Sequence, residues 1–434
     1  MRILSAATAI FAVLTTVSAA RDSLPDCSGL PNTSPVIEPN VIPLKTVLNG
    51  QSYLLSNDSA NYVYLAKVSG SPYEMGYAQG ELFKDELPLQ LLNYETLYPV
   101  MTQSVLHTNA ILPDEYILMI PEWILIPLGK FLLDMNWYIA LPWIPQRYAD
   151  ELEGMADASG LSFERLRRAN MVPEIIQAHC TVFGAWGPAT EDGKVYHLRA
   201  LDWNPFTPIN QFPAIIIYES NEEGSQTIAN INYLGWIGTL TTMSKLGISV
   251  GEKVMLPREG SHDYPEWPQV TYFGKPWQFV LRDTTQFATN LADVYYMLNT
   301  AKRTMRIHGG WGSAPDHSFR GMDFAANFVK LYDDHNYTHY SNQSHPQMDG
   351  IFYLDKHVQP SDNQCIKNII TPQYGHITAE TIYSNLIGDH RTGDNMWVVM
   401  KPESGDIWMA SSQYGAPVEA YRRSPIHVRL GDFW

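Results

Sequence analysis

The chain has 434 residues, of which 45% are hydrophobic and 17% charged. These proportions are ordinary for a folded globular protein and exclude both wholesale disorder and a small disulfide-stapled scaffold. Lys and Arg number 29 against 45 Asp and Glu, so the formal net charge is −16. A chain this acidic has no electrostatic attraction to phosphate backbones, and we therefore expect no nucleic-acid partner.

The first 20 residues predict an export signal. Arg2 supplies a positive charge, 3–17 is apolar or small, and Ser18-Ala19-Ala20 offers the small residues that a signal peptidase needs. The apolar part is shorter than the ~20 residues that span a bilayer, although an uncleaved membrane anchor is the alternative. We expect 1–20 to be removed and the protein to be secreted or lysosomal.

The cysteines and the glycosylation motifs fit this route. An odd number of cysteines in an oxidising compartment allows one pair and leaves one free thiol. A free thiol in a secreted protein is either an accident or a working nucleophile. The cysteines are Cys27, Cys180 and Cys365, and the Asn-x-Ser/Thr acceptor motifs begin at Asn32, Asn57, Asn336 and Asn342.

The front part of the chain is predicted to be helical after an irregular lead-in over 21–60 and a strand over 62–68. Ser71, Pro72 and Glu74 form a helix-start signal with a capping box, and this helix is expected to run toward Tyr94. A second helix is predicted over 147–158, and a third begins at Ser162.

The segment 111–145 is unusually apolar but is interrupted by charges and by Pro121, Pro127 and Pro142. The prolines predict short helices rather than one long one. Exposed apolar faces with Trp at their rim would touch lipid, whereas a hydrophobic hairpin packed on the rest of the fold is the alternative.

Beyond residue 180 the pattern becomes strand-like. A helical front part with a strand-rich back part predicts an α+β fold. Strands are predicted over 195–203, 214–218, 227–233, 238–243, 248–254, 327–332, 350–354, 396–400 and 407–411, with a helix over 287–301.

The sharpest chemical feature is Cys180, which begins a strand and is followed by a turn and by a strand carrying Arg199 and Asp202. A thiol nucleophile needs a base, and no His has an obvious spacing for one. If the bond between His179 and Cys180 were cut, the new α-amino group of Cys180 could act as the base, because its pKa of about 7.7–8.0 is near neutral. Asp202 would hold that amine, and Arg199 would either bind a substrate oxygen or support Asp202. A buried structural cysteine is the alternative.

These residues resemble a known family. Cys180-Thr181, an Asp-Gly turn and Arg199-x-x-Asp202-Trp203 resemble the N-terminal-nucleophile cysteine hydrolases, in particular acid ceramidase and N-acylethanolamine-hydrolysing acid amidase, with penicillin acyltransferases and bile-salt hydrolases further away. The resemblance runs discontinuously from about residue 68 to the end. It includes 70–77, 151–156, 234–241 with Gly247, and Asp355-Lys356-His357 ahead of Cys365.

The resemblance implies an αββα sandwich and a precursor that cuts itself before the nucleophile. Residues 21–179 would become the light chain and 180–434 the catalytic heavy chain. It also implies a disulfide between Cys27 and Cys365, leaving Cys180 free. Finally, it implies an Asn in the oxyanion hole, for which Asn342 is the candidate and His345 the rival.

Two features depart from the family pattern. Lys356 and His357 stand where relatives have an Arg, and Glu252-Lys253 stands where relatives often have Asn. The reaction class therefore transfers better than the substrate does.

Two other sets of residues suggest different chemistry. Gly247-x-Ser249-x-Gly251 with His308-Gly309-Gly310 would suit a serine hydrolase, but no helix is predicted after Ser249 and the Gly-rich loop comes too late in the chain. His335, His339 and His345 are interpreted as surface-loop histidines rather than metal ligands.

The expected function is an amidohydrolase that cleaves N-acyl lipids without a cofactor or metal. A phospholipase B-like or acyltransferase activity on the same fold, and a non-catalytic secreted lipid-binding protein, are the alternatives.

Overall fold

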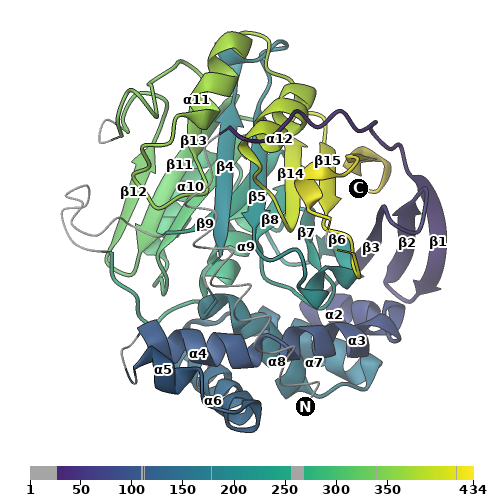
Figure 1. Ribbon diagram of the computed structural model, residues 1–434. Helices are drawn as coiled ribbons and strands as arrows, with labels where there is room; N and C mark the ends of the chain where they lie inside the picture. Colours follow the sequence, from purple (N-terminus) through teal and green to yellow (C-terminus); the bar gives the residue numbers. More distant parts are fainter. Residues whose placement is uncertain are drawn as a thin grey trace.

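The computed structural model describes residues 27–434 except 109–110, 112, 177, 256–267, 338–339 and 417. The predicted signal 1–20 lies outside the described residues. The chain has an α+β fold in which two mostly antiparallel sheets lie above a layer of helices (Figure 1).

The larger sheet has ten strands in the order β1-β2-β3-β6-β7-β8-β9-β10-β11-β12. Its one parallel pair joins β3 to β6, so β1, β2 and β3, which precede residue 180, belong to a sheet formed mainly after it. The bounds are β1 Asn40–Val47, β2 Gly50–Ser56, β3 Tyr62–Gly70, β6 Pro213–Ser220, β7 Ile228–Tyr233, β8 Thr241–Ser244, β9 Ile248–Val254, β10 Ile307–Ser313, β11 Ser318–Ala325 and β12 Phe328–Tyr332.

The smaller sheet has six antiparallel strands in the order β13-β4-β5-β14-β15-β16. Its strands β4 and β5 form the hairpin that carries the candidate nucleophile. The bounds are β13 Ile351–Leu354, β4 His179–Ala185, β5 Tyr196–Asp202, β14 Met396–Lys401, β15 Asp406–Ser411 and β16 Ile426–Arg429.

The longer helices before residue 180 lie together below the sheets in Figure 1. The later helices pack beside the strands instead. The bounds are α2 Pro72–Leu82, α3 Glu86–Glu95, α4 Tyr98–Thr108, α5 Asp114–Ile117, α6 Glu122–Ala140, α7 Gln146–Ser159, α8 Phe163–Met171, α9 Trp277–Phe287, α10 Leu291–Thr300, α11 Cys365–Ile370 and α12 Ile387–His390.

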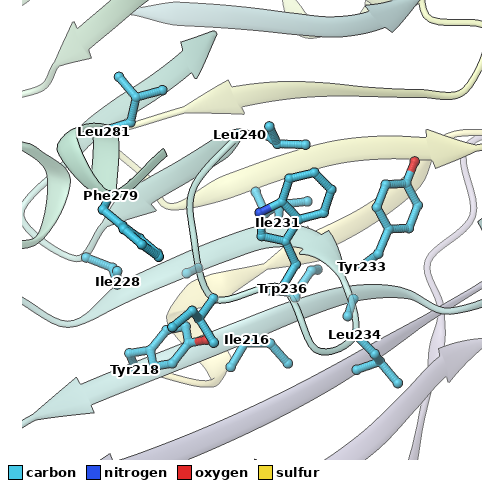
Figure 2. Packing of buried hydrophobic residues seen from close by; sticks show 14 of the residues in the cluster. Ile216, Tyr218, Ile228, Ile231, Tyr233, Leu234, Trp236, Leu240, Phe279 and Leu281 are labelled. Atoms are coloured by element: carbon cyan, nitrogen blue, oxygen red, sulfur yellow. The ribbon is translucent and has the colours of Figure 1, made fainter. Parts of the chain in front are cut away.

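The two sheets pack against each other through β4 and β5 on one side and β9 and β10 on the other. Close approach needs small residues: a Cβ built on Gly310 of β10 would lie 2.4 Å from the Val182 side chain of β4. Helices α9 and α10 contact the larger sheet, whereas α11 and α12 share a buried apolar cluster with the smaller one. Figure 2 shows Phe279 and Leu281 of α9 in a cluster with Tyr218 of β6 and Ile228 of β7. This packing fixes the strands that carry the site.

Several predicted helix boundaries are correct because their capping signals are local. Ser71 accepts a hydrogen bond from the Glu74 backbone, and the Glu74 carboxylate accepts one from the Ser71 backbone. Ser162 caps α8, and Gly160 ends α7 in the left-handed conformation at φ +76°.

Three predictions about elements are wrong. The lead-in 21–60 contains β1 and β2, and the single helix toward Tyr94 divides into α2 and α3. Pro127 does not end a helix but lies inside α6. The helix predicted over 287–301 is confirmed as α10, whereas the preceding helix α9 was not predicted.

Helix α6 is part of one stretch, Glu122–Trp143, that is long and apolar enough to cross a bilayer by length and composition. About a third of its most apolar window is buried (33%). The core helix of a soluble protein has the same properties, so this match is weak evidence for a membrane span.

Candidate active site

The β4–β5 hairpin brings the candidate nucleophile and its predicted partners together. Antiparallel pairing places Cys180 opposite Leu201, His179 opposite Asp202, and Val182 opposite Arg199. Because paired residues share a face and alternate along a strand, Cys180 and Arg199 lie on one face and Asp202 on the other.

The Cys180 thiol lies against an ion pair that joins the two sheets. Its sulfur is 3.5 Å from Nη2 of Arg199 and 3.8 Å from Oε1 of Glu252 on β9, to which the thiol is oriented to donate. The same Arg199 nitrogen pairs closely with Glu252 Oε1, and Arg199 Nε donates to the Glu252 carbonyl at 3.3 Å. All three side chains are buried. The thiol therefore contacts a buried ion pair, although Cys180 also belongs to the main buried apolar cluster.

Asp202 is held by two donors on the opposite face of the hairpin. The Thr392 hydroxyl donates to Oδ2 at 2.6 Å and the Gly393 backbone N–H donates to Oδ1 at 2.9 Å. Thr392 is in turn 2.7 Å from the hydroxyl of Thr181, the residue after Cys180. The Asp202 carboxylate is thus fixed beside the start of β4.

Burial, followed by the Glu252 carboxylate, raises the pKa of the Cys180 thiol to about 12, while Arg199 and Lys253 oppose this rise. In the uncut chain described here the sulfur is therefore protonated at neutral and acidic pH. A nucleophilic role requires a base to take that proton.

Asn342, the predicted oxyanion donor, lies in an exposed turn. Its role stays a prediction. The rival His345 is fully buried, stacked on Tyr353 at 4.6 Å between ring centroids. Its interpretation as a surface-loop histidine is therefore wrong.

One of the predicted glycosylation positions is contradicted by its burial. The Asn32 amide nitrogen donates to the carbonyls of Tyr421 at 3.1 Å and Arg423 at 2.8 Å, so it is not available to a glycan in the fold. Asn57, Asn336 and Asn342 are exposed and remain predictions.

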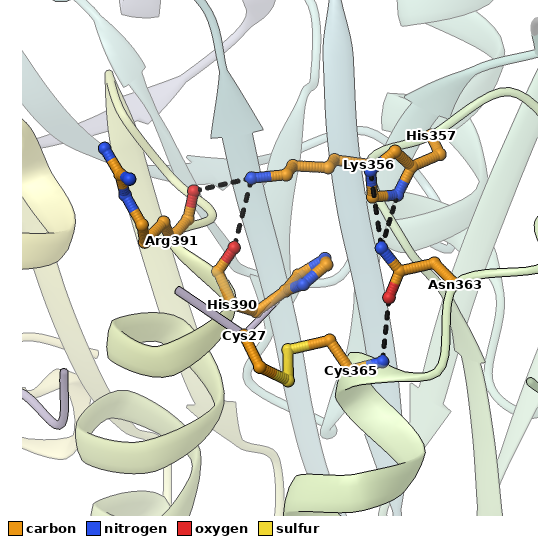
Figure 3. The surroundings of a disulfide bond; sticks show 7 residues. All are labelled: Cys27, Lys356, His357, Asn363, Cys365, His390 and Arg391. Atoms are coloured by element: carbon orange, nitrogen blue, oxygen red, sulfur yellow. Dashed lines mark hydrogen bonds between the residues drawn. A yellow bond between two sulfur atoms is a disulfide. The ribbon is translucent and has the colours of Figure 1, made fainter. Parts of the chain in front are cut away.

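The structure contains the disulfide Cys27–Cys365, which Figure 3 shows. Cys180 is the free cysteine. Figure 3 also shows Lys356, whose ammonium donates to the carbonyls of His390 at 3.1 Å and Arg391 at 2.9 Å. The Lys356 carbonyl is 3.0 Å from Nδ1 of His179. The predicted cluster before Cys365 thus contacts the residue that precedes the nucleophile.

Asp355 at the end of β13 is the buried acid of this cluster. It accepts hydrogen bonds from the His357 backbone at 3.0 Å and from Gln359 at 3.0 Å. Burial opposes its charge, but the hydrogen bond and positive charge of His357 outweigh burial and hold the pKa of Asp355 well below its usual range.

Sequence reasoning did not predict that Glu252 would contact the thiol or that Thr392 would contact Asp202. A Glu-Lys pair inside the strand Ile248–Val254 is itself a signal, because charged groups are costly to bury without a function or a partner. No sequence pattern marks Thr392, because it contacts Asp202 only after the chain has folded.

The serine-hydrolase alternative has no support in the local geometry. Ser249 lies within β9, which continues to Val254, and Gly309 and Gly310 lie within β10 rather than in a loop. The Ser249 hydroxyl is 2.8 Å from Nδ1 of His197, but Nε2 of that ring has no hydrogen-bond partner among the described residues. An acid that would orient the histidine is therefore missing from the described contacts.

The metal prediction concerns His335, His339 and His345. His339 lies outside the described residues, and His335 is exposed with Nε2 3.0 Å from Asp349. Among the described residues, no group of three His, Cys, Asp or Glu side chains is placed to hold a metal ion.

No family model matches the chain. Two Dictyostelium discoideum proteins are similar along most of its length. Protein dcd1B is 29% identical over 83% of this chain and 70% of its own, and protein dcd1A is 26% identical over 94% of both.

Two solved structures have more distant similarity. A Caenorhabditis elegans N-acylethanolamine-hydrolyzing acid amidase ortholog has a TM-score of 0.36 and 12% identity, covering 57% of this chain and 100% of its own. A mutant conjugated bile acid hydrolase from Clostridium perfringens has a TM-score of 0.35 and 10% identity, covering 58% and 93%. TM-scores this low do not establish a shared fold.

Proposed function

We propose that this chain is an amidohydrolase that cuts its own backbone between His179 and Cys180 and then uses Cys180 as an N-terminal nucleophile. The observation that carries the proposal is the Cys180 sulfur, 3.5 Å from Arg199 at the start of a strand whose neighbour holds Asp202. A buried structural cysteine needs neither a guanidinium beside it nor a fixed carboxylate at the preceding residue.

In the first reaction the Cys180 sulfur attacks the His179 carbonyl carbon. The C–N bond to Cys180 breaks, its nitrogen takes a proton, and a thioester forms. Water then hydrolyses the thioester, giving a carboxylate at His179 and a free α-amine at Cys180. Asp202 would hold that amine, and the pairing of His179 with Asp202 across the hairpin supports this role.

In the second reaction the α-amine takes the thiol proton and the sulfur attacks the carbonyl of an N-acyl substrate. Breakdown of the tetrahedral intermediate breaks the amide bond, and the departing amine receives the proton. Water cleaves the acyl thioester and restores the thiol. The proposed reaction needs no cofactor.

Lipid amides, such as ceramide-like or N-acylethanolamine-like compounds, are the proposed substrates. Exposed apolar side chains on α6 support this choice: Trp123 is 75% exposed, Phe131 57% and Tyr138 58%. Spacings of eight and seven residues place them on one stripe of the helix. This stripe would contact a membrane surface or a lipid acyl chain.

The proposal also covers how the precursor is processed, where it is delivered and how it folds. It includes removal of 1–20, secretion or delivery to a lysosome, a light chain 21–179, a heavy chain 180–434, and an αββα sandwich of the N-terminal-nucleophile type. The disulfide Cys27–Cys365 supports the two-chain form, since it would join the chains after cleavage.

Two alternatives use the same architecture. A phospholipase B-like or acyltransferase activity would use the same Cys180 with a different acyl donor or acceptor. A lipid-binding protein without catalysis would keep the exposed stripe of α6 but would leave the backbone uncut.

A denaturing gel with and without reductant tests the proposal. The wild type should give two chains that separate only on reduction, and Cys180→Ala should give one. An amide-linked lipid substrate, an ester-linked analogue and an amine acceptor then distinguish hydrolase, phospholipase and transferase activities. A Cys180→Ala protein that is still cut at His179 contradicts the mechanism.

A further inference from the structure

Lys253 of β9 is a buried cation that faces the candidate nucleophile. Ser249, Gly251 and Lys253 alternate along β9 and therefore share a face. Ser249 bonds His197 of β5 at 2.8 Å, and a Cβ on Gly251 would lie 2.7 Å from Cβ of Arg199. This face thus covers the hairpin that carries Cys180, and Lys253 lies toward the end where β4 begins.

The ammonium group of Lys253 has no hydrogen-bond partner among the described residues, although the side chain is fully buried (0% exposed). Burial lowers its pKa, and the strongest opposing influence is the negative charge that Cys180 carries as a thiolate, followed by Asp355 and Asp202. One oxygen of Glu252 binds Arg199, and Asp202 binds Thr392 and Gly393. Glu252 Oε2 and Asp355 Oδ2, like the ammonium, have no hydrogen-bond partner among the described residues. An unpartnered buried ammonium is costly, so its retention beside a nucleophile calls for a ligand.

We propose that Lys253 is a catalytic residue that donates a hydrogen bond to the carbonyl oxygen of the substrate as Cys180 attacks. This inference rests on the proposed function and names the group that holds its oxyanion. As the carbon–sulfur bond forms, the carbonyl π electrons move to the oxygen, which becomes negative close to the sulfur. An ammonium that interacts with the thiol but does not bond it is suited to that charge.

One observation favours the carbonyl oxygen as the ligand of Lys253. Asn342, the predicted oxyanion donor, is exposed, so no other side chain is assigned to that role.

The test compares Lys253→Met with Lys245→Met, an exposed lysine in the turn before β9. Both are made in the full chain, with a site for a site-specific protease inserted between His179 and Cys180 so that every variant can be cut. This insertion separates catalysis from self-cleavage, which passes through an oxyanion of its own. Turnover of a neutral lipid amide is then measured per cut chain, together with thermal unfolding.

Lys253→Met should lower kcat about 100- to 1,000-fold with KM within a few fold, as loss of one oxyanion donor does. Its thermal stability should be unchanged or raised, because an unpaired buried charge is replaced by an apolar side chain of similar length. Lys253→Arg should retain more activity than Lys253→Met. A kcat within threefold of the Lys245→Met control, or a defect confined to KM for anionic amides, overturns the assignment. Inactivity of the cut wild type overturns the proposed function as well.

Discussion

The Cys180 thiol and the Glu252 carboxylate share one partner, the Nη2 nitrogen of Arg199. The three groups come from β4, β9 and β5, so this contact joins the two sheets at the proposed nucleophile. All three side chains are buried. The Arg199 guanidinium and the Glu252 carboxylate therefore each need the other as a counter-charge.

The first prediction concerns this ion pair. Glu252→Gln should lower the free energy of unfolding by about 3–5 kcal/mol, because the Arg199 guanidinium is left buried without its counter-charge. Arg199→Met should cost a similar amount, whereas the double variant should lose less than the sum. Chemical denaturation of the four proteins measures this coupling. Strictly additive losses would show that the pair does not act as a unit.

The second prediction concerns access to the thiol. In uncut protein Cys180 should not react with iodoacetamide at pH 7, because it is fully buried and burial raises its pKa to about 12. After cleavage the α-amine can take the thiol proton, so the labelling rate should rise by at least tenfold. Mass spectrometry of the labelled peptide measures both forms, and Cys180→Ala controls for labelling elsewhere. Equal labelling of cut and uncut chains would contradict a role for the new terminus.

The third prediction concerns acid stability. Glu174 is fully buried, and burial raises its pKa to about 8, so the folded state holds the neutral acid. A group with a raised folded-state pKa contributes full stability below its unfolded pKa of about 4.3 and loses it as pH rises toward 8. Relative to Glu174→Gln, the wild type should therefore lose a few kcal/mol of unfolding free energy between pH 4.5 and 8, at about 1.4 kcal/mol per pKa unit. Parallel urea titrations at these pH values test this. A constant difference between the two proteins would show that Glu174 is ionised throughout.

The fourth prediction concerns the disulfide. After cleavage, Cys365→Ser should let the chains separate on a non-reducing denaturing gel. The same protein should remain whole in native size-exclusion chromatography, because β3 is hydrogen-bonded into the larger sheet along β6. We expect a stability loss of about 2–5 kcal/mol. Dissociation under native conditions would mean that the strand pairing does not hold the chains.

The fifth prediction concerns the exposed stripe of α6. Replacing Trp123 and Phe131 by Ser should weaken cosedimentation with neutral phosphatidylcholine vesicles at least fivefold, because both side chains are exposed. Ser substitutions at Phe273 and Tyr296, which are 59% and 69% exposed outside α6, provide the matched control. Equal binding by the two double variants would remove the membrane-contact proposal.

Local signals predicted more of the fold than of the site. The Ser71–Glu74 capping box and Gly160 determine their helix ends by contacts within a few residues, and these boundaries are correct. Helix α6 was predicted to break at Pro127, but tertiary packing retains the helix around the proline. Strands β1 and β2 were not predicted, because Pro43 and the polar residues around it favour an irregular segment. Proline is tolerated here because β1 lies at the edge of the sheet.

The same division applies to the active site. Arg199 and Asp202 share a hairpin with Cys180, so a short spacing in the sequence was enough to find them. Glu252 reaches the thiol from the other sheet, and Thr392 reaches Asp202 from the loop before β14. Such contacts depend on how the sheets pack, which no short motif records.

The most direct test of the central claim is the mass and N-terminal sequence of each chain in the mature protein. The account predicts a heavy chain that begins at Cys180 in active material, with Cys180→Ala uncut and inactive. Uncut protein with full activity, or a Cys180→Ala variant cut at the same bond, would contradict it.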